Sequence, residues 1–245
     1  CHMVTVSAKT TTDRRRWIGQ VALGALALFA GRATAFGPAS RFRVGLLAGT
    51  GSEDQADAWA RLHLELSRRT SVECVARPVV VQPTENLLFT LPFVVLSGSE
   101  GLPKWTPEAW VKLARYLAAG GFLWIDNRGE EAFSASVLER LGREFSAEST
   151  VQIDKEHVLY RSFYLLEGEV GRRPGSPNLR GLRLDGRMAV LAGTVDLAGA
   201  FERDTFGAWR HRCEPGGEPQ REQAIRFAVN LVMYSVCTDY KADQV

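Results

Sequence analysis

The chain has 245 residues, of which 45% are hydrophobic and 24% charged, a balance that excludes an intrinsically disordered chain and fits a globular protein with a sizeable core. The formal net charge is +2, and no basic stripe is interleaved with aromatic residues, so we expect no nucleic-acid partner. Of the four cysteines, Cys1 precedes the mature part predicted below; the other three, Cys74, Cys213 and Cys237, lack metal-ligand spacing, and their odd number excludes a complete disulfide framework in that part.

The amino-terminal segment resembles a twin-arginine export signal. The paired arginines are Arg14 and Arg15. Trp17 and Ile18 follow them in the place where such signals usually carry Phe and Leu. An apolar run over residues 21–30 follows, and it is about half the length that a membrane-spanning helix needs. Ala33-Thr34-Ala35 then has the small-x-small pattern of a signal peptidase site.

We therefore predict a signal peptide of the twin-arginine type over residues 1–35 and a single mature domain over residues 36–245. The processed protein is expected in the periplasm, with no integral membrane segment. The alternative is an uncleaved amphipathic anchor, which would keep the domain at the membrane.

Short apolar runs alternate with amphipathic segments in the mature part, and this pattern predicts an α/β fold. The expected strands are residues 42–48, 72–76, 93–97, 122–126 and 187–193, and residues 78–83 are expected to be extended. The expected helices are residues 53–69, 134–145 and 221–236, together with one that begins at Thr106-Pro107-Glu108 and stops at Gly120-Gly121. Residues 157–167 read as strand or irregular packing, and residues 171–181 and 214–219 as loops.

Three ordered blocks carry a resemblance to a known family: Leu96-Ser97-Gly98-Ser99-Glu100-Gly101, Gly120-Gly121-Phe122-Leu123-Trp124-Ile125-Asp126 and Ala228-Val229-Asn230-Leu231-Val232-Met233-Tyr234. Together with residues 157–164, they resemble the bacterial domain-of-unknown-function family 4159. The resemblance implies the flavodoxin-like fold of class I glutamine amidotransferases, a three-layer sandwich with a mainly parallel sheet. It also implies a setting beside cell-envelope and von Willebrand-type or MoxR-linked proteins, but no particular reaction.

The sequence departs from the amidotransferases at the point of nucleophilic attack. In those enzymes the strand after a Gly-Gly-like helix stop ends in a Cys elbow, whereas the matching positions here are Asp126 and Asn127. A carboxylate is a poor substitute for a thiolate in attacking an amide. The downstream His-x-Glu pair of those enzymes has no counterpart either. We therefore expect no amidotransferase activity.

Three strand-to-helix turns should gather at the carboxyl edge of the sheet, where open α/β sheets bind ligands. The predicted ligand-binding residues in these turns supply backbone N–H groups, hydroxyls, carboxylates and a guanidinium: Ser97, Gly98, Ser99, Glu100, Asp126, Asn127 and Arg128. The alternative is structural, with Asp126 and Asn127 capping the next helix and the serines satisfying turn backbone.

Asp126, Asn127 and His157 are the candidate catalytic residues, with Glu100 assisting in a hydrolase. A metal site would require the fold to gather Asp126, His157 and Asp196. Scattered histidines without i, i+4 spacing are more typical of ordinary side chains, so we expect no metal. Gly49-x-Gly51 lacks the third glycine of a dinucleotide fingerprint and the lysine of a phosphate loop, so we expect no cofactor.

Aromatic and charged residues mix in residues 201–209, which could form a flap, a partner contact or a satellite core. We expect an exported, non-catalytic amidotransferase-like domain that binds a protein partner or a small polar ligand in the cell envelope. Two alternatives stay open. One is an envelope hydrolase that uses Asp126 as base or metal ligand. The other is a structural subunit that leaves the apolar face of its last helix partly exposed.

Overall fold

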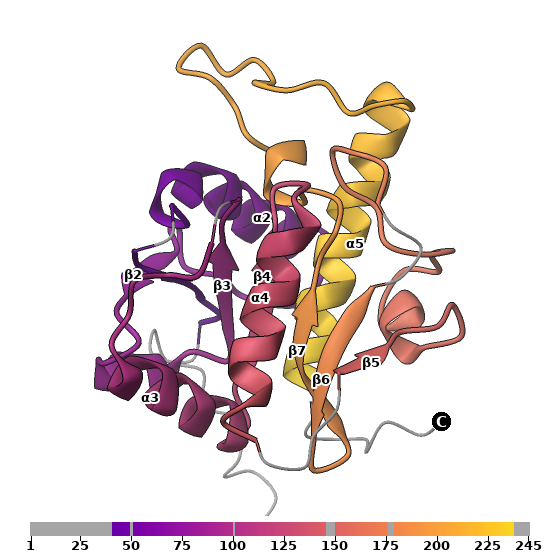
Figure 1. Cartoon of the computed structure of the whole chain (residues 1–245). Helices are drawn as coiled ribbons and strands as arrows, with labels where there is room; N and C mark the ends of the chain where they lie inside the picture. The colour runs from indigo at the N-terminus through magenta and orange to yellow at the C-terminus, as the bar shows by residue number, and fades with distance from the viewer. Residues whose placement is uncertain (1–40, 50, 100, 146–149, 176–178, 238–245) are drawn as a thin grey trace, which may run out of the picture. The chain divides into compact units, whose positions relative to one another are not determined.

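The structure is a computed structural model that describes residues 41–49, 51–99, 101–145, 150–175 and 179–237 (Figure 1). The predicted signal peptide lies outside these residues. Residues Phe42–Val245 form one compact unit, which carries all of the strands and helices described below.

The described residues form one sheet of seven strands in the order β2-β1-β3-β4-β7-β6-β5. The strands are β1 (Val44–Leu47), β2 (Val79–Val81), β3 (Phe93–Ser97), β4 (Phe122–Asp126), β5 (Thr150–Gln152), β6 (Arg180–Leu184) and β7 (Arg187–Ala192). The first five strands in this order pair in parallel, whereas β6 is antiparallel to both β7 and β5. The sheet is therefore mixed, and the prediction of a mainly parallel sheet is corrected at this edge.

Helices cover both faces of the sheet and make three layers. One face packs against α2 (Ala56–Arg69) and α5 (Gly217–Cys237), and the other against α3 (Pro107–Ala118) and α4 (Glu131–Gly142). In Figure 1, α4 lies in front of the sheet and α5 behind it. Every residue of β3 and β4 is buried, as expected for strands covered on both sides.

Short 3-10 helices complete the fold: η2 (Glu53–Gln55), η3 (Asn86–Thr90), η4 (Val158–Arg161) and η5 (Ala198–Ala200). The apolar face of α5 is buried against the sheet, with Ala224, Phe227, Ala228, Val229, Leu231 and Val232 inside the core. The partly exposed helix face expected of a structural subunit is therefore covered within the chain itself.

The segment from α3 to β4 confirms the sequence prediction closely. The Thr106 side chain accepts a hydrogen bond from the Ala109 N–H at 3.4 Å, and Pro107 occupies the first turn. Gly120 has φ +105, a left-handed conformation that ends the helix. A Cβ atom at Gly121 would come within 2.2 Å of the Tyr116 ring, so only glycine fits there.

Residues 72–76 do not form the predicted second strand, whereas the segment predicted to be extended, residues 78–83, contains β2. Residues 72–76 contribute a single bridge between Cys74 and Phe42, and Val79–Val81 forms β2 by pairing with Gly45–Leu47. Both segments are short and apolar and run beside β1. Their composition alone does not say which of them completes a ladder.

The antiparallel edge was missed by the sequence analysis. β6 begins inside the predicted loop at residues 171–181, and β5 has three residues without a fully buried position. Asp185 and Gly186 connect β6 to β7 with φ +49 and +82. Two positive φ values are typical of a two-residue hairpin turn, and Asp-Gly between apolar residues is the sequence signal that could have revealed it.

Candidate functional site at the carboxyl edge of the sheet

A cavity lies where the turns after β1 and β3 diverge. β1 leads to α2 on one face of the sheet and β3 leads to α3 on the other, and open α/β sheets bind ligands at such a crossing point. The cavity has a volume of about 380 Å³. The described residues that line it are Gly49, Gly98, Ser99, Gly101, Leu102, Pro103, Lys104 and Phe133.

Close packing and one hydrogen bond fix the walls of this cavity. A Cβ atom at Gly98 would come within 2.4 Å of Cε2 of Phe133, so the chain can pass this ring only as glycine. The Trp105 indole N–H donates to the Ala48 carbonyl at 2.9 Å and holds the segment before α3 against the end of β1. Lys104 is exposed on the rim and gives it a positive charge.

The predicted ligand-binding residues separate into two groups. Gly98 and Ser99 line the cavity, whereas Ser97, Asp126 and Asn127 are buried beneath the turns. Glu100 lies outside the described residues.

The predicted arginine has a structural contact. The Arg128 guanidinium donates to the Gly51 carbonyl at 2.6 Å and so ties the turn after β4 to the turn after β1.

Asp126 is completely buried and receives two backbone hydrogen bonds. Its Oδ1 accepts from the Leu197 N–H at 3.2 Å and its Oδ2 from the Ala198 N–H at 2.8 Å, at the start of η5. Burial and the charge of Asp196 raise the pKa of Asp126 to about 7, while its backbone hydrogen bonds act in the opposite direction. This carboxyl group is enclosed by the chain and does not line the cavity.

Asn127 stabilises the turn that follows β4. Its Oδ1 accepts from the Gly129 N–H at 2.8 Å, which is the pattern of an Asx turn. Its Nδ2 is buried without a hydrogen-bond partner among the described residues. Asn127 therefore stabilises a turn and does not cap α4, whose N-cap residue Glu130 has no side-chain capping hydrogen bond.

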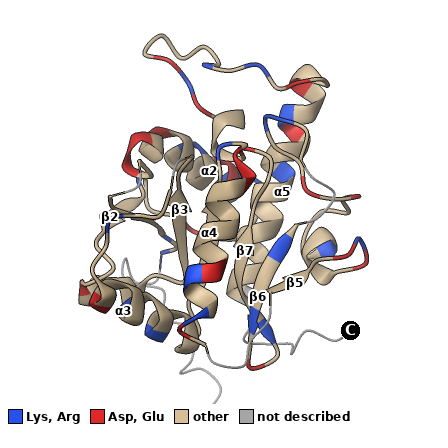
Figure 2. Cartoon of the chain, viewed as in Figure 1, with Lys and Arg blue, Asp and Glu red and all other residues tan. Residues whose placement is uncertain are grey.

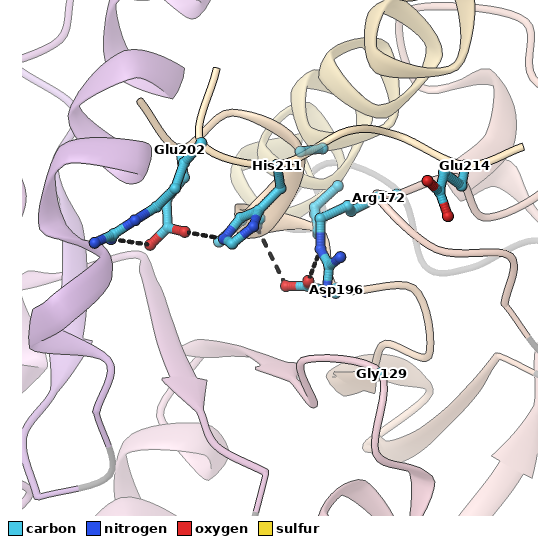
Figure 3. A network of polar contacts seen from close by, with 12 residues as sticks. Gly129, Arg172, Asp196, Glu202, His211 and Glu214 are labelled. Atoms are coloured by element: carbon cyan, nitrogen blue, oxygen red, sulfur yellow. Dashed lines mark hydrogen bonds and ion pairs between the residues drawn. The ribbon is translucent and has the colours of Figure 1, made fainter. Parts of the chain in front are cut away.

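The fold places two further carboxyl groups beside the ends of β4 and β7. Glu169 accepts hydrogen bonds from the N–H and the hydroxyl of Thr194, both at 2.8 Å. Loss of water around its carboxyl group raises the pKa of Glu169 to about 8, opposed by the Thr194 hydrogen bonds and reinforced by the charge of Asp126. Asp196 accepts from Arg172 Nε (Figure 3).

Glu169 was not predicted, because it lies in an irregular segment without a motif. It borders a second cavity, of about 550 Å³, which is separate from the one beside Lys104. The described residues around that cavity are Leu165, Leu166, Glu167, Gly168, Glu169, Val170 and Gln223.

The structure does not bring His157 to Asp126. His157 Nδ1 accepts from the Leu159 N–H at 3.2 Å, and its ring lies 5.5 Å from that of Tyr234. Tyr234 in turn contacts Phe122, which begins β4, whereas Asp126 ends it. The grouping of Asp126, His157 and Asp196 considered for a metal site is therefore not formed. Among the described residues, no cluster of three or more His, Cys, Asp or Glu side chains could hold a metal ion.

The segment after η5 extends away from the sheet as an arm, residues 202–216 (Figure 1). Three aromatic residues in the arm or directly before it have different environments. Phe201 is buried against Trp59, Trp209 lies between two arginines, and Phe206 is exposed at the tip. At the base of the arm, His211 and Glu202 are 2.9 Å apart in a polar network (Figure 3).

Charged residues and cysteines in the described part of the chain point to no further functional site. Acidic and basic side chains are intermixed over helices and loops (Figure 2). Cys213 is a buried free thiol and Cys74 a half-buried one. No helix between residues 41 and 237, within the described ranges, is long and apolar enough to cross a membrane.

Comparison with known proteins gives a family without a known activity. No functionally curated protein matches this chain. The sequence model of one family matches residues 43–236, which cover nearly all of the compact unit. The chain belongs to this family, described as Domain of unknown function (DUF4159).

Proposed function

We propose that this chain is an exported, non-catalytic domain with the flavodoxin-like arrangement of class I glutamine amidotransferases, and that it binds a small polar ligand in the cell envelope. The parallel strands follow the order β2-β1-β3-β4-β7, in which β7 takes the fifth position of the flavodoxin-like order. The ligand would occupy the cavity between the turns after β1 and β3.

The composition of that cavity is the observation that carries the proposal. Its described lining offers glycine backbone, the Ser99 hydroxyl and the Lys104 ammonium group, and it contains no Cys, His or carboxylate side chain. Such a lining can hold a polar ligand by hydrogen bonds and one positive charge. Among the described lining residues there is no activated nucleophile and no general base.

The position of Asp126 supports a binding role over a hydrolase. A general base must reach the proton that it removes, or reach it through one water. Both carboxylate oxygens of Asp126 already accept backbone hydrogen bonds, and His157 is at the other end of β4. The hydrolase alternative would need this enclosed group to become accessible.

The experiment compares two lysine variants of the purified chain. Native mass spectrometry would first identify small molecules that copurify with it, and calorimetry would then measure their affinity. Lys104→Glu should weaken binding of an anionic ligand at least about tenfold, because it replaces an attractive charge with a repulsive one. Lys155→Glu makes the same change in net charge at an exposed site that does not line the cavity, and should leave the affinity unchanged.

Two results would contradict this proposal. Equal weakening by both lysine variants would mean that the cavity does not bind the ligand. Turnover of a substrate that is abolished by Asp126→Ala would instead establish the hydrolase.

A further inference from the structure

Carboxyl groups from two separate parts of the chain hold the junction between β7 and η5. Asp126, at the end of β4, accepts hydrogen bonds from the Leu197 and Ala198 N–H groups at 3.2 and 2.8 Å. Glu169, in the segment between η4 and β6, accepts from the N–H and the hydroxyl of Thr194, both at 2.8 Å. Carboxylate oxygens therefore fix the junction at both of its ends.

The junction, residues 194–198, also carries a carboxyl group of its own. The Asp196 side chain is buried and accepts a hydrogen bond from the Gly199 N–H at 3.3 Å. Arg172 Nε donates to the same carboxylate and forms an ion pair with it (Figure 3). Three carboxyl groups and one guanidinium group thus meet around five residues of backbone.

Residues 169–173 connect the junction to the base of the arm. The Arg172 N–H donates to the Asp196 carbonyl at 3.2 Å. The Arg172 carbonyl accepts from the Glu214 N–H, near the end of the arm, at 3.0 Å. Movement of the junction would therefore be transmitted through this segment to the arm.

Two of the three carboxyl groups exchange protons near neutral pH. Burial and the charge of Asp196 raise the pKa of Asp126 to about 7, while backbone hydrogen bonds, including one from Arg128, oppose the rise. Burial, reinforced by the charge of Asp126, raises the pKa of Glu169 to about 8. Ionisation of both adds two negative charges to an enclosed space in which Arg172 already pairs with Asp196.

The other ionisable groups that face this cluster do not offset these charges. Burial and the charge of Glu169 raise the pKa of Tyr160 on η4, so its phenol stays neutral. Burial raises the pKa of the Cys213 thiol in the arm, which lies near Asp196 and Arg172, so it also stays neutral at pH 7.

We propose that the β7–η5 junction is a proton-operated latch, closed when Asp126 and Glu169 are protonated and open when both are ionised. Opening returns the like charges to water and separates them. It also releases residues 169–173 and the base of the arm from the junction. The state of the arm therefore follows the pH around the protein.

Proton linkage gives the direction and the range of this response. In water the two carboxyl groups have ordinary pKa values of 3.8 and 4.5, so opening releases protons. The advantage of the closed state is fully present below pH 3.8 and is lost as the pH rises through about 7 for Asp126 and about 8 for Glu169. Release of one proton alone should raise the opening constant at least about 100-fold between pH 5 and pH 8.

Hydrogen exchange of three backbone amides measures the latch directly. The N–H groups of Thr194, Leu197 and Ala198 donate to the two carboxyl groups, so they exchange when the junction opens. Their protection factors, measured by NMR on the full chain, should fall at least about 100-fold from pH 5 to pH 8. The amides of β3 are buried on both faces of the sheet and report unfolding of the whole domain. At pH 8 the junction amides should be at least about 100-fold less protected than those of β3.

Two glutamine variants on the same segment separate the latch from a general effect of charge. Glu169→Gln can keep both contacts with Thr194 but cannot ionise, so the fall in protection should shrink by about tenfold or more. Glu167→Gln makes the same change at an exposed position two residues away and should keep the native profile.

Three results would overturn the proposal. Equal protection of the junction amides at pH 5 and pH 8 would show that protons do not operate the junction. Protection equal to that of β3 at both pH values would mean that the junction opens only when the whole domain unfolds. Identical profiles for Glu169→Gln and Glu167→Gln would exclude Glu169 from the latch.

Discussion

At the scale of the residue, Asp126 joins two segments that are distant in the sequence. It ends β4 and accepts hydrogen bonds from Leu197 and Ala198 at the start of η5. Its pKa is raised from 3.8 to about 7, so the folded state disfavours its charged form. The resulting contribution to stability is fully present below pH 3.8 and is lost as the pH rises through about 7.

We therefore predict that Asp126→Asn reduces the pH dependence of stability. Between pH 5 and pH 8 the free energy of unfolding should fall more for the native chain than for the variant, by on the order of 2–4 kcal/mol. Urea denaturation at both pH values measures this difference. Asp185→Asn removes an exposed acid from the β6–β7 turn and should preserve the native pH dependence. Parallel pH profiles for the native chain and Asp126→Asn would contradict the prediction.

The location of Asp126 could be predicted from the sequence, but its role could not. The apolar run before it and the glycines after α3 place it at a strand end. Its hydrogen-bond donors lie about seventy positions further along the chain, and no local pattern indicates them. The same holds for Glu169, whose partner Thr194 follows a strand at the other side of a loop.

At the scale of the element, the β6–β7 hairpin depends on a turn with two positive φ values. Gly186 has φ +82 and nothing within 4 Å of where a Cβ atom would be, so a side chain there meets backbone strain alone. Gly186→Ala should destabilise the fold by about 1–2 kcal/mol, measured by chemical denaturation.

Gly142→Ala is the matched control for this prediction. Gly142 also has open space around its Cβ position, but it lies at the end of α4 without a positive φ. Alanine should stabilise it by about 0.5–1 kcal/mol. Destabilisation by both substitutions would mean that space, and not φ, limits these positions.

The predictability of each element followed its burial. β3 and β4 are covered on both faces, and their continuous apolar runs gave their bounds correctly. β5 is the edge strand and β6 pairs with it, and their fewer buried positions produce a weaker pattern, so pairing with a neighbour decides the structure. Burial likewise did not distinguish Val79–Val81, which forms β2, from residues 72–76, because either segment could have paired with β1.

At the scale of the whole molecule, export remains a prediction from residues 1–35. Replacement of Arg14 and Arg15 by lysine should retain the precursor in the cytoplasm of a bacterial host, because the paired arginines define this type of signal. Cell fractionation and amino-terminal sequencing measure the outcome, and the native mature chain should begin at Phe36. Arg32→Lys is the control and should be exported normally. Export that is indifferent to the paired arginines would exclude this route.

The two edges of the sheet limit how this molecule can recruit a peptide. β2 has three residues and is enclosed by Pro78 and Pro83, which lack an N–H, and β5 also has three residues. At either edge of the sheet, too few backbone groups are available for stable pairing with an added strand. The same shortness protects the fold from fibril-like stacking of exposed backbone. We therefore expect a protein partner to contact this domain through side chains, and not by adding an extended segment to either edge of the sheet.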